Sequence, residues 1–249
     1  MTELYKYRCF DRYSLECISE NVIWVADSKT LNDPFDCTYN VVANLSYEEV
    51  RSAIKGVTKE NYKLKQDEFI EKMRSDFVIG GIFCLSESRE ISLMWSHYAD
   101  CHKGFCVGYT STSSGTTKNC HEVIYGDFPS ISLRELFTAA ATDNPQLAQK
   151  FFNTTVLHKD INWKYEKEHR FLFQQCNTLI RPPDLGISSI TFGMLMPEAE
   201  RNIIRKVLKD RDIEFYEAYK PDVGYNVKIK KAQPESGPYL DNARFEGDV

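Results

Sequence analysis

Short stretches of alternating and apolar residues recur along most of the chain. Alternation predicts half-buried strands at 4–8 (LYKYR) and 21–28, and a nearly continuous apolar run predicts a strand buried on both faces from 77, ending at Ser86. The same patterns predict further strands at 105–110, 121–128, 166–174, 187–194, 213–219 and 225–231. Strands therefore contribute most of the expected core.

Helical patterns lie between these strands. Apolar residues near helical spacing predict a short helix at 11–20, and LMWSHYA predicts one or two turns at 93–99. Start signals predict the remaining helices. A capping box at Ser46 and Glu49 begins one helix, and Thr58 begins another that reaches about Phe77. Ser132 with Glu135, and Asn144 before Pro145, begin two helices over 132–157, and Pro197 lies at the first position of a further helix.

Together these elements predict an α+β fold with a mostly antiparallel central sheet and helical insertions. We expect one domain over 1–233, with a helical insertion at about 46–77. From Pro234 onward the sequence contains Gly, Pro and Asp, so residues 234–249 are predicted to form a mobile tail.

Composition and charge narrow the class of protein. The 249 residues are 42% hydrophobic and 27% charged with a net charge of −5, which is typical of a soluble globular protein. No apolar run approaches the ~18 residues that a membrane span needs, and the N-terminus lacks the pattern of a signal peptide. We therefore expect a cytoplasmic protein without membrane association, and the acidic balance argues against a broad duplex-DNA surface.

Eight cysteines and several histidines raise the question of metal binding. His97, Cys101, His102, Cys106, Cys120 and His121 lie close together in the sequence, but no two short-spaced ligand pairs of the C-x-x-C type occur. Reduced, mostly buried thiols and hydrogen-bonded histidines explain the residues equally well, so no metal site is predicted. The chain also lacks a G-x-S-x-G nucleophile motif and a glycine-rich phosphate loop.

Two other segments contain candidate binding residues. In the loop KTLNDPFDC, the turn chemistry of Asn32, Asp33 and Pro34 predicts an ordered loop. Trp95 and Tyr98 lie at i, i+3 spacing on the predicted helix, which fits either an aromatic core stripe with His97 as a hydrogen-bonded partner or a stacking platform for a planar ligand.

The segment WKYEKEHRF places two glutamates two residues apart. In a strand, Glu166 and Glu168 would share one face. One interpretation is a solvated strand edge whose charges are neutralised by Arg170 and Lys167. The other is a functional pair in which one carboxyl pKa is raised, or in which both carboxylates stabilise a cationic transition state. Spacing alone favours the edge.

Five blocks of the sequence together resemble a bacterial family catalogued as domain of unknown function 2971. These blocks are LYKYR, LNDPFD, FCLSE, MWSHYADCHKGFCVGY and WKYEKEHRF, and they extend over about residues 4–219. The resemblance indicates a fold neighbourhood but implies no activity.

A more distant resemblance is to the ADP-ribosyltransferase fold, which implies a split sheet. Arg8 on the first strand, a strand-end Ser86 (preferred to the Ser-Thr-Ser at 111–113) and the late Glu166-x-Glu168 match its order of residue types. The resemblance implies nicotinamide adenine dinucleotide (NAD) as cofactor, with its diphosphate on Arg8 and its nicotinamide stacked on Trp95 or Tyr98.

The same resemblance implies a division of roles among the remaining residues. Glu168 would bind the ribose and stabilise its cation, with Glu166 as helper. His97 completes the catalytic set, and Tyr7, Asn32 and Asp33, together with Ser86, complete the cofactor-binding set.

The leading hypothesis from the sequence is an NAD-dependent ADP-ribosyltransferase-like enzyme, as a bacterial toxin or antiphage-defence effector. Its acceptor would be a protein or a nucleic acid. The alternatives are a non-catalytic nucleotide- or nucleic-acid-binding module of the same fold, in which Trp95, His97 and Tyr98 recognise a base, and a hydrolase or nuclease using Glu168 with His169 or His97. The sequence leaves catalysis itself and the oligomeric state open.

Overall fold

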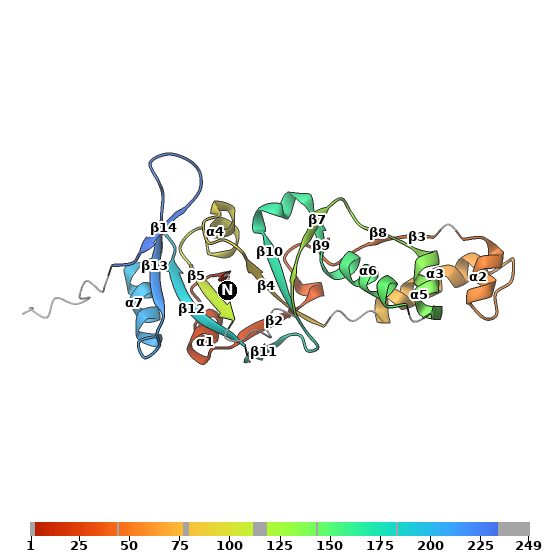
Figure 1. Ribbon diagram of the computed structural model, residues 1–249, viewed down its shortest axis with the longest axis horizontal. Helices are drawn as coiled ribbons and strands as arrows, with labels where there is room; N and C mark the ends of the chain where they lie inside the picture. The colour runs from red at the N-terminus through yellow and green to blue at the C-terminus, as the bar shows by residue number, and fades with distance from the viewer. Residues whose placement is uncertain are drawn as a thin grey trace, which may run out of the picture. The chain divides into compact units, whose positions relative to one another are not determined.

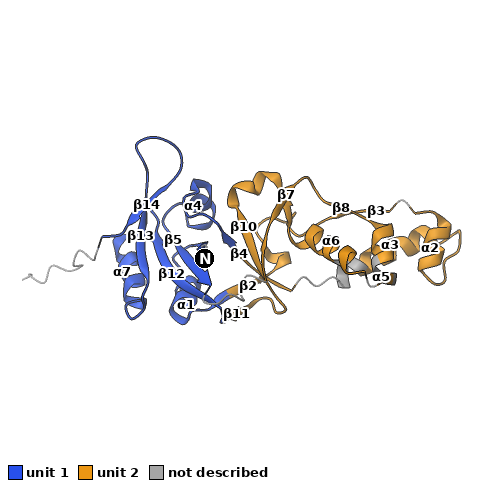
Figure 2. Ribbon diagram, viewed as in Figure 1, with its two compact units in different colours: residues 1–23, 85–116, 181–249 blue, residues 24–84, 117–180 orange. Residues whose placement is uncertain are grey.

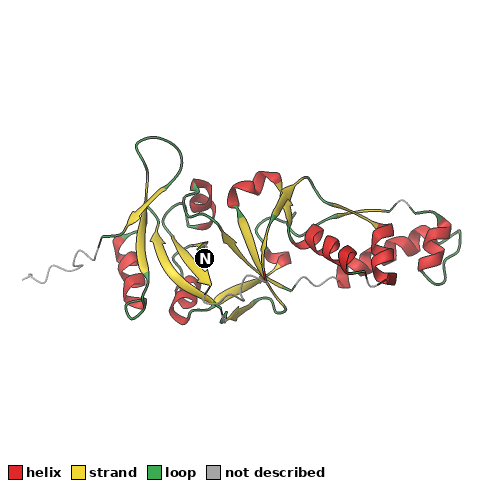
Figure 3. Ribbon diagram, viewed as in Figure 1, coloured by secondary structure: helices red, strands yellow, loops and turns green. Residues whose placement is uncertain are grey.

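The fold is α+β, with mostly antiparallel sheet and helices between the strands (Figures 1 and 3). A computed structural model describes residues 3–43, 45–76, 80–111, 119–142, 144–182 and 184–233. The predicted mobile tail, 234–249, lies outside the described residues. Within those ranges, no helix is both long and apolar enough to cross a membrane.

The chain divides into two compact units (Figure 2). Unit 1 comprises residues 1–23, 85–116 and 181–249, and unit 2 comprises 24–84 and 117–180. The prediction that 1–233 form a single domain stays a prediction, and each unit is described by itself.

The sheet of unit 1 is built around β5 (Phe105–Ser111), whose first five residues are buried. β5 pairs antiparallel with β1 (Leu4–Arg8) on one side and with β12 (Leu185–Phe192) on the other. β13 (Glu214–Tyr219) continues the sheet parallel to β12, and β14 (Lys228–Lys231) follows antiparallel to β13. On the far side of β1, Tyr5 pairs with Ser86, the last residue of β4 (Gly81–Ser86).

The described part of unit 1 contains the helices α1 (Arg12–Glu20), α4 (Ser92–Tyr98) and α7 (Glu198–Val207). The side chain of Asp11 caps α1 by accepting the Ser14 N–H at 2.7 Å, and Asn21 ends it in the left-handed conformation. Pro197 was predicted to be the first residue of this helix, but it is the residue directly before α7.

Unit 2 contains a second group of antiparallel strands and two small parallel pairs. β4 pairs with β2 (Ile23–Asp27) and with β10 (Glu168–Phe173), β10 pairs with β6 (Cys120–Glu122), and β11 (Thr178–Ile180) lies beside β2. The parallel pairs are β3 (Asn40–Val42) with β8 (Ser130–Ser132), and β7 (Ile124–Gly126) with β9 (His158–Asp160).

The described helices of unit 2 are α2 (Tyr47–Ala53), α3 (Tyr62–Asp76), α5 (Leu133–Thr142) and α6 (Pro145–Val156), with short 3-10 helices at Ser28–Thr30 (η1) and Ile161–Glu166 (η3). Side chains of α3, α5 and α6 pack in an apolar cluster formed by Ile70, Ile131, Leu133 and Leu136. The predicted capping box of Ser46 and Glu49 at the start of α2 is confirmed.

Three predicted boundaries are wrong for local reasons. The helix expected from Thr58 begins at Tyr62, because the Asn61 side chain accepts the Thr58 N–H at 2.7 Å and closes a turn there. The strand expected at 121–128 is two short strands, β6 and β7. The strand expected from Glu166 begins at Glu168, because Lys167 adopts a left-handed conformation with φ 47° after η3.

We expect Gly104→Ala to destabilise the protein by about 1–3 kcal/mol, the usual cost of overpacking a tight site. A Cβ atom at Gly104 would lie 2.1 Å from the carbonyl oxygen of Arg8, a backbone atom of the paired strand β1. Urea unfolding measures the change. Lys103→Ala, at the exposed neighbouring position, should leave the unfolding midpoint nearly unchanged, and equal effects of the two substitutions would contradict the prediction.

Candidate functional site

One buried cluster in unit 2 contains all the buried charged side chains of the described residues. Its members are three carboxylates and two cations: Asp36, Glu166, Glu168, Lys159 and Arg170. Charged side chains are almost never fully buried unless they are paired. The two glutamates singled out in the sequence are therefore part of a paired ionic network.

Arg170, on β10, is fully buried, and all three nitrogen atoms of its guanidinium group donate hydrogen bonds. Nε donates to Oε1 of Glu168 at 2.8 Å, and Nη2 donates to both oxygens of Asp36 at 2.9 and 2.7 Å. Nη1 donates to the carbonyl oxygen of Val156 at 2.6 Å and contacts Sγ of Cys37 at 3.3 Å. The planar guanidinium group of Arg170 thus holds the carboxylates of Glu168 and Asp36 in fixed positions.

Lys159, on β9, is the second cation. Its Nζ donates to Oε2 of Glu166 at 2.5 Å and to Oε2 of Glu168 at 2.9 Å, and lies 3.6 Å from Oδ2 of Asp36. Burial by itself would lower the pKa of Lys159, but the carboxylates of Glu168, Glu166 and Asp36 outweigh burial and raise the pKa. The ammonium group is therefore charged.

The local backbone explains how both glutamates reach Lys159. Asp160 caps η3 by accepting the Asn162 N–H at 2.8 Å, and η3 ends at Glu166. The left-handed residue Lys167 then reverses the chain into β10, where the Glu168 N–H donates to the hydroxyl of Tyr125 at 2.8 Å. The two carboxylates thus converge through a turn rather than through the alternation of a strand.

Burial and the two cations act in opposite directions on Glu168. Burial raises the pKa of the carboxyl group, but Arg170 and Lys159, with the hydrogen bond from Arg170, outweigh burial and lower the pKa well below its usual range. Glu168 is therefore ionised at neutral pH.

The interpretation of Glu166 and Glu168 as a solvated strand edge is wrong. Their exposed fractions are 3% and 4%, and Glu166 is not in a strand. Arg170 does pair with Glu168, whereas Lys167 is exposed and the partner shared by both glutamates is Lys159.

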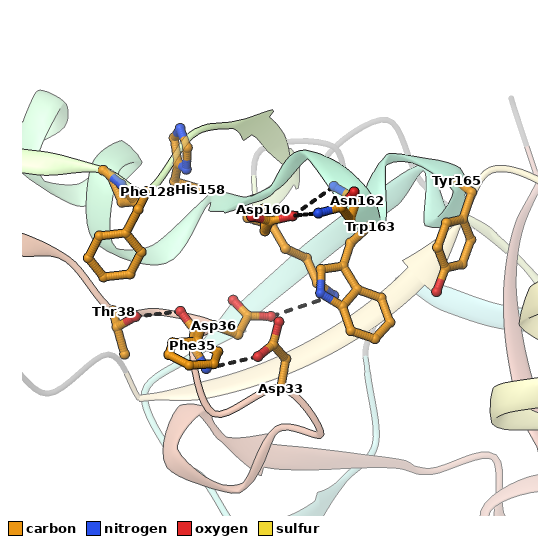
Figure 4. A pocket seen from close by; sticks show the side chains of 12 residues that line it. Asp33, Phe35, Asp36, Thr38, Phe128, His158, Asp160, Asn162, Trp163 and Tyr165 are labelled. Atoms are coloured by element: carbon orange, nitrogen blue, oxygen red, sulfur yellow. Dashed lines mark hydrogen bonds and ion pairs between the residues drawn. The ribbon is translucent and has the colours of Figure 1, made fainter.

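A cavity of about 680 Å³ in unit 2 adjoins this cluster. Its lining includes the buried Asp36 and Lys159, so the cluster forms part of its wall. The other lining residues are Asp33, Phe35, Thr38, Phe128, Pro129, His158, Asp160, Asn162, Trp163 and Tyr165, and Figure 4 labels all of these except Pro129.

Aromatic rings surround the open part of this cavity. Phe35 is 71% exposed and Phe128 is 53% exposed, and both side chains line this cavity. The Asp33 carboxylate accepts the Phe35 N–H at 2.9 Å, which is the turn contact expected of an aspartate at this position. The Trp163 ring covers the Lys159 ammonium, with Nζ 5.1 Å from the ring centroid.

His158 adds a polar group to the same lining. Burial lowers its pKa, with nearby Asp127 acting in the opposite direction, so the imidazole is neutral at physiological pH. Its Nδ1 is buried and has no hydrogen-bond partner among the described residues.

The residues predicted for the site from the sequence fall into two groups. Asn32, Asp33, Glu166 and Glu168 belong to unit 2, where Asn32 is exposed and Asp33 lines the cavity. Tyr7, Arg8, Ser86, Trp95, His97 and Tyr98 belong to unit 1. The expected convergence of Arg8, Ser86 and Tyr98 with Glu168 stays a prediction.

Within unit 1, the arrangement around Trp95 is that of an aromatic core. Trp95 is fully buried, its Nε1 donates to the carbonyl oxygen of Arg89 at 2.8 Å, and Tyr7 packs edge-on against it at 5.1 Å. His97 is exposed, and its ring lies 6.2 Å from that of Tyr98. Of the two interpretations left open for Trp95, the structure supports the core stripe.

Sequence reasoning missed Phe35, Asp36, Phe128, Lys159 and Trp163. Phe35 and Asp36 lie within the LNDPFD block and Trp163 begins WKYEKEHRF, so their place in these blocks could have identified them as candidates. Nothing in the sequence identifies Lys159 as a site residue, because an isolated lysine is usually exposed. Among the described residues, no group of three or more His, Cys, Asp and Glu side chains is placed to hold a metal ion.

Comparison with known proteins gives one match. The model of a family described as "Protein of unknown function (DUF2971)" matches residues 94–171. This match confirms the predicted family resemblance over that range, and the rest of the expected extent, 4–93 and 172–219, stays a prediction. No curated protein and no solved structure matches the chain, and no comparison supports the resemblance to ADP-ribosyltransferases.

We expect Lys159→Met to lower the free energy of unfolding by about 3–5 kcal/mol at pH 7, because it leaves buried carboxylates without their shared cation. Urea unfolding measures the loss, which should shrink at lower pH as carboxylates take up protons. Lys164→Met, on an exposed residue of η3, is the matched control. A similar small effect of both substitutions would contradict a central role for Lys159.

We expect the stability of the protein to fall as the pH falls below about 4.5, the ordinary pKa of a glutamate. A carboxyl group whose pKa is lower in the folded state contributes stability above its unfolded pKa, and this contribution is lost as the pH drops toward the folded pKa. Unfolding free energies at pH 7, 5, 4 and 3 measure the slope. Glu168→Gln should reduce the dependence of stability on pH, while Glu122→Gln, on an exposed residue, should not. If neither substitution changes this dependence, Glu168 is not its source.

Proposed function

We propose that unit 2 is a ligand-binding module whose cavity takes the planar ring of a nucleobase or of a similar aromatic group. The observation that carries this proposal is the pair of exposed rings, Phe35 and Phe128, beside Trp163 and Tyr165 on one cavity. Stacking on aromatic side chains is the usual way in which proteins hold unstacked bases.

The size of the cavity supports the same ligand class. Its volume of about 680 Å³ lies within the ~300–1,000 Å³ range of small-molecule sites. A nucleoside fits this range, and the phosphates of a nucleotide would extend toward solvent. The proposal therefore concerns recognition of the base.

Polar groups on the lining can orient a base. The Asp33 and Asp160 carboxylates accept hydrogen bonds, and the Asn162 amide both donates and accepts. A few such groups among aromatic rings are typical of sites that fix one orientation of a ligand.

The geometry of Glu168 favours binding over ribosyl transfer. Oε1 accepts from Arg170, and Oε2 accepts from both Lys159 and Arg170, in a side chain that is almost fully buried. A ribose hydroxyl would have to displace one of these cations. The NAD-dependent ADP-ribosyltransferase-like activity, with its toxin or antiphage role, remains the alternative proposal.

We expect unit 2 to bind adenosine in the full-length protein. Because base stacking on an aromatic side chain contributes ~1–3 kcal/mol, the double variant Phe35→Ala, Phe128→Ala should weaken binding by at least about 10-fold. Isothermal titration calorimetry measures the affinity. Leu64→Ala removes a comparably exposed apolar side chain on α3, away from the cavity lining, and should leave binding unchanged.

Two outcomes would change the proposal. If the protein binds neither adenosine nor any other nucleoside nor NAD, the proposed base-binding function is overturned. Transfer of label from NAD to a lysate component, abolished by Glu168→Gln but not by Glu122→Gln, would instead support the enzyme hypothesis.

A further inference from the structure

We infer that the ligand ring held by the aromatic cavity of unit 2 carries a positive charge, as in an amidinium, a pyridinium or an N-alkylated base. The inference rests on the proposed function, because it specifies the ligand class of the same cavity. Three independent features of the lining lead to it: the charge of the buried cluster, the charge of the rim, and the aromatic faces.

The buried cluster contains more carboxylates than cations. Among the described buried residues, three carboxylates accompany two cations, Lys159 and Arg170. Carboxylates in a poorly solvated position favour a nearby cation. A bound cation next to Asp36, on the cavity wall, would complete the balance.

The rim of the cavity is negative as well. Asp33 and Asp160 both line the cavity, and each has a carboxylate oxygen that accepts a backbone N–H, from Phe35 and Asn162 respectively. Lys159 is the single lysine or arginine in the described lining, and three carboxylates already surround it. His158 is neutral because burial lowers its pKa. An anionic group would therefore be repelled from this lining.

The aromatic faces favour the same charge. The face of an aromatic ring is the negative part of its quadrupole, and cations lie over it. The cavity already contains one such contact, between Trp163 and the Lys159 ammonium. A planar cation stacked near Phe35 and Phe128 would gain both from ring stacking and from the carboxylates.

A pair of probes with the same shape and different charge tests the inference. Benzamidine is a planar cation at neutral pH, and benzamide is its neutral counterpart. We expect the full-length protein to bind benzamidine at least about 10-fold more tightly than benzamide at low ionic strength, with the difference shrinking as salt is added. Calorimetry or ligand-observed NMR measures both affinities.

Two substitutions identify the groups responsible for the preference. Asp33→Asn and Asp160→Asn remove charge, while the asparagine side chain can still accept the backbone N–H that each aspartate accepts. Each should weaken benzamidine binding about 3- to 10-fold and leave benzamide binding unchanged. Asp67→Asn, on an exposed position of α3, should change neither.

The outcomes separate this inference from the proposed function. Equal binding of benzamidine and benzamide, with adenosine also bound, would overturn the cation preference and leave the aromatic binding site standing. If benzamidine, benzamide and adenosine all fail to bind, the binding site itself is overturned. Benzamidine binding that stays at its original affinity in both aspartate variants would overturn the contribution of the rim carboxylates to the preference.

Discussion

The ionic contacts of Lys159 and Arg170 with three buried carboxylates are the constraint on which the rest of unit 2 depends. They join the loop before β3 to strand β9, helix η3 and strand β10, three consecutive elements that lie far from this loop in the sequence. Each charge has lost most of its hydration, so every partner is needed to compensate the others. The network therefore specifies one arrangement of these four segments, more than it adds to stability.

That arrangement also determines what the cavity presents to a ligand. The loop residue Asp36 is held by Arg170, and this contact places the neighbouring Phe35 at the opening. Asp160 caps η3, which begins just after the Lys159 position and carries Trp163 over the ammonium. The charge of the cavity wall and the position of the aromatic rim thus depend on the same contacts. A substitution that weakens the network should disturb both.

Much of the local structure could be predicted from the sequence, whereas the network could not. Alternation and capping signals identified β1, β5, α2 and α6, because these features arise from neighbouring residues. The glutamate pair was noticed, but its geometry depends on the left-handed Lys167, which no period-two pattern indicates. Lys159, the cation shared by both glutamates, has an ordinary sequence context, and only tertiary contacts show that it is buried.

The extent of the family match suggests how ligand selection is divided along the chain. Residues 94–171 contain Lys159, Arg170, Glu166 and Glu168, a set in which two cations balance two carboxylates. Asp36 lies outside the match together with Asp33 and Phe35, whereas Phe128, Asp160 and Trp163 lie inside it. The proposed preference for a planar cation therefore depends on residues of the loop at 31–39 and on residues of the matched range.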